Sequence, residues 1–205
     1  IETNLGCLQG SKLEKLLKRL PPNLIHFVVS TKGEFDRGRV AQIPVLGNPN
    51  GSRVLVEFTD YNCPYCKRAM AEVQGLLEGD DNIRLVYREW PILGDGSVFA
   101  AKAALASREQ GKYETFHWAL MGMQGRADEA SVMRIAKEVG LDIDRLRADM
   151  ETPEIQEHIA TSMRLTQALG FNGTPSFVIG DELVPGCVEE DKLRALVDKV
   201  REAAE

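Results

Sequence analysis

The stretch VLVEFTDYNCPYCK, residues 54–67, decides how this chain folds. Its first five residues, 54–58, have the length and the β-branched content of a buried strand. From Pro64 to about Leu77 the apolar side chains recur with helical spacing, so Cys63 lies where a strand gives way to a helix. Proline is favoured at the first position of a helix. The sequence therefore predicts Cys63 as the residue that caps this helix.

This position gives Cys63 a distinctive chemistry. Unpaired backbone N–H groups and the positive end of the helix dipole stabilise negative charge at a helix start. Thiols in such motifs have pKa values of about 3.5 to 7.5, and the thiolate is the species that attacks and leaves in disulfide exchange. Cys66, three residues later, lies on the same helical face and is close enough to form a disulfide. We therefore predict a redox site with Cys63 and Cys66 as its catalytic pair.

Two other uses of a cysteine pair have to be weighed, namely half of a zinc site and an inert structural disulfide. A zinc site needs a second ligand pair at similar spacing. The remaining candidates are scattered singly along the chain: Cys7, Cys187, His26, His117 and His158. The strand-to-helix context favours redox chemistry, and we predict no metal and no cofactor.

Length and composition limit the choices further. The 205 residues predict one domain that carries an insertion, or one and a half domains, and with 43% hydrophobic residues the chain has ample material for a core. A net charge of −6 argues against nucleic acid and against anionic membrane surfaces as partners. No apolar run approaches the ~18 residues of a membrane span. Because the chain begins at Ile1 without a signal-like apolar stretch, we expect a processed protein whose signal has been removed.

Residues 1–39 are predicted to form a separate leader. The tetrapeptide SKLE at 11–14 is a capping box, and the helix that it opens carries one apolar stripe: Leu13, Leu16, Leu17 and Leu20. So short a helix is marginal alone. Its stripe is therefore expected to dock on the main body or on another chain.

The rest of the chain predicts an α/β, thioredoxin-like fold with an inserted helical domain. Residues 40–94 and 171–205 are assigned to the thioredoxin-like domain, and residues 95–170, which have the pattern of five helices, to the insertion. The first domain opens with an extended connection and a turn at 43–51. It continues with the strand of the opening stretch, its helix and a parallel second strand at 83–88. Strand character returns in two short segments, 176–179 and 183–184.

With these motifs in place, the chain resembles the DsbA-like thiol–disulfide oxidoreductases of the bacterial envelope. The likeness runs from about residue 43 to the C-terminus and is carried by four motifs: VLGNP at 45–49, EFTDYNCPYCK at 57–67, PILG at 91–94 and GTP at 173–175. The leader departs from the family pattern. The resemblance implies a periplasmic location, dithiol exchange with unfolded or partly folded exported proteins, and a membrane or soluble redox partner that resets the site.

Glu57 lies six residues before Cys63 and matches the acid that the family places beneath its active site. Independently of that match, an acid within a strand buried on both faces is costly. Such a group is expected to have a raised pKa and to move the proton of Cys66 during exchange. The alternative is that Glu57 lies at an edge and faces water.

Pro175 follows Thr174 and matches the family's cis-proline loop, so the resemblance implies a cis bond where an ordinary X–Pro bond is trans. A cis bond would present the backbone of Thr174 beside Cys63, where an extended substrate can pair with it by strand addition. Pro64 and Tyr65, between the cysteines, are expected to contact substrate and to tune the redox poise. The predicted substrate-binding residues are thus Thr174, Pro175, Pro64 and Tyr65.

Two further pairs of residues keep two interpretations each. Cys7 and Cys187 either pair in an oxidising compartment, which would stabilise the fold by roughly 4–5 kcal/mol in the loop-entropy model, or Cys187 is a small buried apolar residue. Lys67 and Arg68 either stabilise the thiolate or belong to the solvated surface.

The leading prediction is a thiol–disulfide oxidoreductase that forms or exchanges disulfides in exported proteins. The leader keeps an alternative open, namely an oligomeric disulfide isomerase or reductase assembled through residues 1–39. A cytosolic glutaredoxin-like reductase also carries Cys-Pro-Tyr-Cys, but the long helical insertion argues against it. From other classes, a non-catalytic periplasmic chaperone or binding module and a copper-handling protein are the alternatives.

Overall fold

The computed structural model describes residues 43–180 and 182–202, which form one five-stranded sheet and the helices around it. The elements in chain order are β1 (Val45–Gly47), β2 (Arg53–Thr59), α4 (Pro64–Gly79), β3 (Ile83–Glu89), α5 (Asp95–Ala106), the 3₁₀ turn η1 (Ser107–Gln110), α6 (Tyr113–Gly122), α7 (Glu129–Glu138), α8 (Ile143–Asp149), α9 (Pro153–Leu169), β4 (Ser176–Ile179), β5 (Glu182–Pro185) and α10 (Glu190–Glu202). This arrangement confirms the predicted fold class, a thioredoxin-like sheet interrupted by a helical insertion.

The strand order β1-β3-β2-β4-β5 places β2 at the centre of the sheet. β2 and β3 are parallel and are joined by α4, as predicted, and β4 and β5 form an antiparallel hairpin beside β2. β1 pairs antiparallel with the outer edge of β3, within residues that we expected to be an extended connection. Its partner strand is distant in sequence, so no local pattern specifies the pairing.

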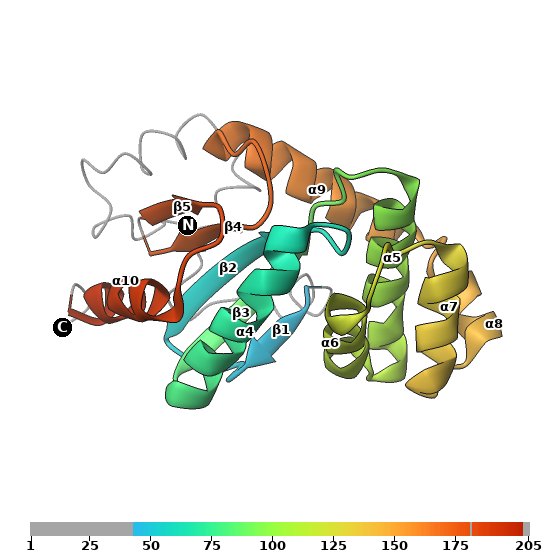
Figure 1. The fold of residues 1–205 in the computed structure, drawn as a ribbon, viewed down its shortest axis with the longest axis horizontal. Helices are drawn as coiled ribbons and strands as arrows, with labels where there is room; N and C mark the ends of the chain where they lie inside the picture. The colour runs from blue at the N-terminus through green and yellow to red at the C-terminus, as the bar shows by residue number, and fades with distance from the viewer. Residues whose placement is uncertain (1–42, 181, 203–205) are drawn as a thin grey trace, which may run out of the picture.

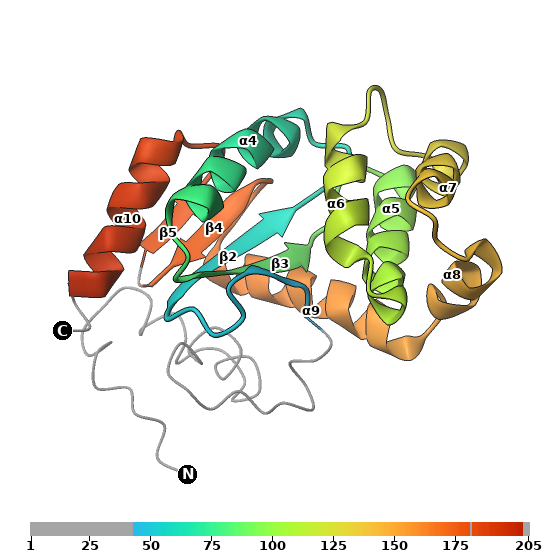
Figure 2. The same cartoon turned by 90° about the horizontal axis from the view of Figure 1, so that it is seen from below.

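The sheet is covered on both faces, and alternate residues of β2 point to opposite sides. Leu55 belongs to the core shared with α4 and α10, whereas Val56 and Phe58 belong to the core under α9. Figure 2 shows the same layering, with α4 and α10 on one side of the sheet and α9 on the other. By this alternation Glu57 points to the α4 face.

The inserted helices α5 to α8 gather at one end of the sheet (Figure 1). α9 contributes to both parts of the molecule, since Ile155 and Ile159 pack with the inserted helices while Leu165 and Leu169 pack beneath the sheet. The limits of the two domains remain a prediction. The proposed leader, residues 1–39, lies outside the described residues. None of the helices in the described ranges is long and apolar enough to span a bilayer.

A buried polar network ties β3 to the insertion. The Tyr113 hydroxyl of α6 donates to Glu89 at 2.6 Å, and the other Glu89 oxygen lies 2.7 Å from Nε2 of His158 on α9. The neighbouring Arg88 donates to the His158 carbonyl at 2.8 Å and to the Ser162 hydroxyl at 3.1 Å. All of these side chains are buried. Charge-assisted hydrogen bonds of this kind are the strong ones, so the network holds the insertion against the sheet.

Removing only the Tyr113 hydroxyl is expected to lower the free energy of unfolding by about 1.5–3 kcal/mol, because a buried carboxylate loses a charge-assisted hydrogen bond. Urea unfolding of Tyr113→Phe and the wild type, followed by circular dichroism, measures the difference. Tyr65, which is 56% exposed, supplies the control, since Tyr65→Phe should change stability by about 0.5 kcal/mol or less. Equal stabilities for Tyr113→Phe and the wild type would contradict this role of the network.

Candidate active site

Cys63 is the N-cap residue of α4, with an extended backbone (φ −81°, ψ 117°), and Pro64 occupies the first turn of the helix. This confirms the predicted placement of Cys63 between a strand and a helix. Cys66 follows one turn later and is buried, and both cysteines are free thiols in the structure. The site is thus described in its dithiol form.

The two thiols differ sharply in acidity. A hydrogen bond from the Cys66 thiol is the main cause that lowers the pKa of Cys63 to about 6; burial opposes it, and the side chain of Thr174 and the backbone N–H groups of Tyr65 and Cys66 add to it. Burial raises the pKa of Cys66 well above its ordinary value, and the negative charges of Cys63 and Glu57 raise it further. At neutral pH the pair is therefore a Cys63 thiolate held by a Cys66 thiol.

Glu57 is 2% exposed and lies in the central strand β2, so its edge-strand alternative is wrong. Burial raises the pKa of Glu57 to about 8, and the hydroxyls of Tyr87 and Thr59 offset part of that rise. One carboxylate oxygen, Oε2, is buried and has no hydrogen-bond partner among the described residues. The acid is consequently poised to hold or release a proton near neutral pH.

The loop after α9 reaches the active site from the far end of the chain. Its Thr174–Pro175 peptide bond is cis, as the family resemblance implied. The carbonyl oxygen of Thr174 lies 3.1 Å from Sγ of Cys63, although the two residues are 111 positions apart. The backbone N–H of Gly186 donates to the Pro175 carbonyl at 2.9 Å and holds the loop against β5. The fold therefore brings Thr174 and Pro175 beside Cys63.

The exposed side of α4 carries the other predicted residues. Tyr65 is 56% exposed, and the guanidinium of Arg68 lies 5.2 Å from the centroid of its ring. The Lys67 ammonium does not turn to the thiolate; it donates to the carbonyls of Met123 at 2.8 Å and Gly125 at 3.1 Å, and burial lowers its pKa. Lys67 thus ties α4 to the loop after α6.

Sequence reasoning did not single out Asp60, which organises the turn before Cys63. This residue is 1% exposed, and its carboxylate accepts hydrogen bonds from the backbone N–H groups of Asn62 at 2.8 Å, Ile92 at 2.8 Å and Leu93 at 3.0 Å. A short acidic residue at a strand end that bonds to the backbone two residues on is a turn signal. That signal was present in the sequence, whereas the contact with the distant loop was not.

Asn62 joins the same turn to the insertion. Its side-chain oxygen accepts from the Ala127 N–H at 2.7 Å, and its amide donates to the Ala127 carbonyl and to the Ser97 hydroxyl, both at 3.1 Å. A Cβ on Gly96 would lie 2.1 Å from the Ala127 carbonyl oxygen, so glycine is required where α5 begins. The active-site turn is therefore anchored on two sides.

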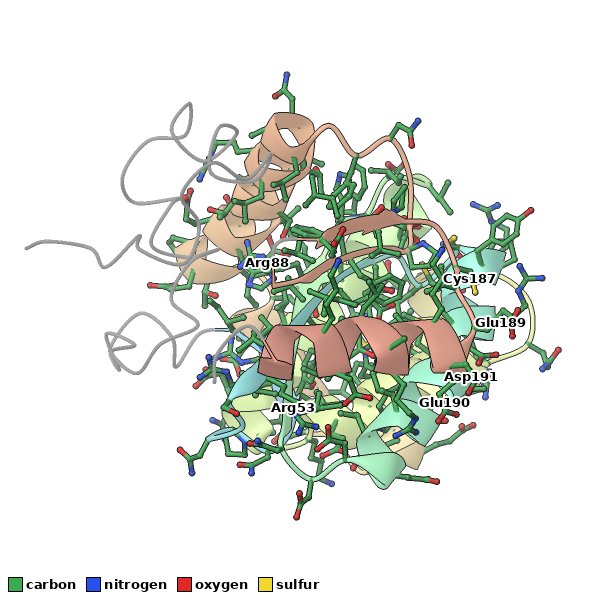
Figure 3. All side chains as sticks on the ribbon, turned by 90° about the vertical axis from the view of Figure 1, so that its left-hand side faces the viewer. Arg53, Arg88, Cys187, Glu189, Glu190 and Asp191 are labelled. Carbon is green, nitrogen blue, oxygen red and sulfur yellow. The ribbon has the colours of Figure 1, made fainter. Side chains whose placement is uncertain are left out.

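Cys187 is a free, half-buried thiol in the link between β5 and α10. Figure 3 shows it near the start of α10, where Glu189, Glu190 and Asp191 gather. Cys187 packs against the main core but is only partly buried, so it is less buried than its interpretation as a small buried apolar residue expects. Cys7 lies outside the described residues, so its pairing with Cys187 stays a prediction. In the part of the chain that the structure describes, no cluster of three or more His, Cys, Asp or Glu side chains could hold a metal ion.

An acidified cysteine paired with a buried, protonated one can exchange disulfides, and here the pair stands on a thioredoxin-like sheet. These properties define a thioredoxin-fold thiol–disulfide oxidoreductase. Comparison with known families agrees, because residues 54–198 match the DSBA-like thioredoxin domain. The chain belongs to that family.

Solved structures of similar proteins support the assignment. A thioredoxin-like oxidoreductase from Silicibacter pomeroyi is 64% identical, with a TM-score of 0.78, over 82% of this chain and 99% of its own. The thiol-disulfide exchange protein alpha-DsbA2 from Wolbachia pipientis is 32% identical, with a TM-score of 0.73, over 80% and 95% of the two chains. A periplasmic thioredoxin-like protein from Salmonella enterica serovar Typhimurium is 28% identical, with a TM-score of 0.69, over 85% and 100%.

The chain also matches longer curated proteins. The Na(+)/H(+) antiporter NhaA 3 of Salinispora tropica is 30% identical over 155 residues, which are 75% of this chain and 24% of the antiporter. The chain thus spans about a quarter of the length of the curated relatives that it matches. Antiport describes those whole proteins and is not assigned to this chain.

Proposed function

We propose that this protein forms or exchanges disulfides in exported proteins through Cys63 and Cys66. The observation that carries the proposal is the opposite shift of the two thiol pKa values, to about 6 for Cys63 and upward for Cys66. Stabilising the Cys63 thiolate favours the reduced form of the pair and makes Cys63 a good leaving group. A disulfide between these cysteines is therefore a ready acceptor of electrons from a client dithiol.

The proposed reaction oxidises a client dithiol in two exchange steps. A client thiolate attacks Sγ of Cys63, the Cys63–Cys66 bond breaks, and its electron pair goes to the Cys66 sulfur, which takes up a proton. The second client thiol loses its proton and attacks the client sulfur of the mixed disulfide, and Cys63 leaves as a thiolate. The client has lost two electrons and two protons; one proton is on Cys66 and the other goes to solvent.

Glu57 is proposed to donate the proton that Cys66 takes up when the Cys63–Cys66 bond breaks. In the reverse direction it would remove that proton from Cys66. A general acid–base works best when its pKa lies near the working pH, and the pKa of Glu57 is about 8. Thr174 and Pro175 are proposed to align an extended client segment beside Cys63 by strand addition, with Pro64 and the exposed Tyr65 completing the contact surface.

The setting that we infer is the periplasm, with unfolded or partly folded exported proteins as clients. The periplasmic relative from Salmonella and the DSBA-like family assignment support this location. A membrane or soluble disulfide-exchanging partner would accept the two electrons and restore the Cys63–Cys66 disulfide. The described residues carry no observation that favours an oligomeric isomerase or a non-catalytic chaperone.

The expected pH profile tests this function directly. Alkylation of Cys63 in the reduced protein by iodoacetamide should show a midpoint near pH 6, fall about tenfold for each pH unit below it, and level off above it. In parallel, the oxidised protein should oxidise a reduced two-cysteine peptide. Cys187→Ala is the control and should leave both results unchanged. A midpoint near pH 9, or no peptide oxidation, would contradict the proposal.

A further inference from the structure

Tyr87 lies directly opposite Glu57 in the parallel register of β2 and β3. The two side chains are 1% and 2% exposed, and hydrogen bonding from the Tyr87 hydroxyl is the largest influence that lowers the pKa of Glu57 against the effect of burial. The tyrosine can serve as a donor throughout the physiological range, because burial, followed by the charge of Glu57, raises its own pKa well above the ordinary value. The tyrosine therefore acts on the acid from the facing position of the neighbouring strand.

The Glu57 carboxyl also interacts electrostatically with the cysteines. Its Oε2 atom is buried and has no hydrogen-bond partner among the described residues. The charge of Glu57 acts on the pKa of Cys66, and that of Cys63 acts on the pKa of Glu57, so both sulfurs are within electrostatic reach. A buried orphan oxygen in a native structure calls for an explanation. Proton exchange with a thiol supplies one.

The Tyr87 ring is held in place by the insertion. The ring of His117 on α6 packs on it at a centroid distance of 4.2 Å, and Trp118 meets it edge-on at 6.2 Å. His117 is fixed in turn, since its Nδ1 lies 2.9 Å from the hydroxyl of Tyr61, next to the active-site turn. The hydroxyl of Tyr87 therefore has little freedom to leave Glu57.

A neutral donor at this place has a specific electrostatic effect. Among the described residues, the titratable groups that interact with Glu57 are Cys63 and Cys66 from the start of α4, Tyr61 from the turn before it, and Tyr87 from β3. None of them is a cation. A cation would hold the carboxyl ionised at all working pH values, whereas a hydroxyl stabilises the ionised form only in part. The acid can then hold or release its proton near neutrality.

We propose that Tyr87 is the positioning residue of Glu57, holding one carboxylate oxygen so that the other faces Cys66 for proton exchange. The positioning stands on the structure, and the proton exchange rests on the proposed function. Tyr87 does not touch substrate, and it acts only through Glu57.

The test uses Tyr87→Phe, which keeps the ring and removes the hydroxyl. The pKa of Glu57 in the reduced protein, measured by carbon-13 NMR of the labelled carboxyl, should rise by about one unit, because the ionised form loses a hydrogen bond. Tyr113→Phe is a matched control. Its ring stacks on the same His117, but its hydroxyl serves Glu89, so the pKa of Glu57 should stay unchanged. An unmoved pKa in Tyr87→Phe, or an equal shift in Tyr113→Phe, overturns the positioning role.

A kinetic arm separates this proposal from the proposed function. The rate at which a mixed disulfide on Cys63 is resolved should depend on pH. In Tyr87→Phe the midpoint of that dependence should rise by about one pH unit, as the pKa of Glu57 does. In a Glu57→Gln background the same change should have no further effect on the rate, because the two residues act as one unit. Equal effects in both backgrounds overturn the role of Tyr87. If wild-type protein fails to exchange disulfides, the proposed function fails while the NMR titration still decides the positioning.

Discussion

Cys63→Ser is expected to abolish both oxidation of a reduced two-cysteine peptide and reduction of insulin, leaving only the uncatalysed rate. A serine hydroxyl is not ionised at neutral pH, whereas the thiol that it replaces has its pKa lowered to about 6 and is mainly thiolate. The change removes both the attacking group and the sulfur that the mixed disulfide needs. Turnover measured at pH 7 with equal amounts of wild type and variant gives the comparison.

Cys66→Ser distinguishes the two sulfurs. It retains the nucleophile Cys63 but lacks the resolving thiol, so a mixed disulfide with the peptide should accumulate and be visible by mass spectrometry. Cys187→Ser is the control for cysteine loss. It should retain the full wild-type rate, since Cys187 lies outside the start of α4, which carries the reactive pair. Measurable turnover by Cys63→Ser, or no trapped adduct with Cys66→Ser, would refute the division of roles.

Glu57→Gln is expected to stabilise the protein at alkaline pH by roughly 3–5 kcal/mol, the second large effect. Burial raises the pKa of Glu57 from 4.5 to about 8 in the folded state. Between these values the folded protein holds a proton that the unfolded chain has released, so the free energy of unfolding falls as pH rises. Each unit of pKa difference corresponds to about 1.4 kcal/mol. Glutamine keeps the shape and cannot ionise, so it avoids this cost.

Urea unfolding of reduced wild type and Glu57→Gln at pH 5, 7 and 9 measures the effect. The difference in stability should be small at pH 5, grow through pH 7 and level off above about pH 8. Glu114, an exposed acid in the first turn of α6, provides the control, because Glu114→Gln should change stability by about 0.5 kcal/mol or less at every pH. A difference for Glu57→Gln that does not increase with pH would refute the buried, raised-pKa acid.

If Glu57→Gln stabilises the protein and also impairs proton exchange, the burial of Glu57 costs stability while it serves the reaction. The network around Glu89 is the opposite case. There a buried acid is hydrogen-bonded by Tyr113 and paired with His158, and its loss is expected to weaken the fold. The two acids lie on adjacent strands of one sheet; Glu89 is paired with His158, whereas the charge of Glu57 acts on Cys66.

Much of the site could be predicted from the sequence because it is encoded locally. The change from β-branched residues to helical spacing placed Cys63 at a helix start, and the acid within the apolar run marked Glu57 as buried. Both depend on neighbours within a few turns of chain. The family resemblance supplied the cis bond before Pro175 and its place beside Cys63, which no local pattern specifies.

What only the tertiary structure decided is which distant side chains meet. Tyr87 and Glu57 are partners through the parallel register of two strands separated by α4, and Asp60 reaches Ile92 through the same packing. Lys67 likewise donates to a carbonyl of the insertion, 56 residues away in the chain, and not to the thiolate. Periodicity fixes which face of an element is buried, whereas register and the docking of helices depend on the summed fit of residues far apart in the chain. The sequence by itself thus determined the reactive dithiol, and the folded structure determined the groups that control its protons.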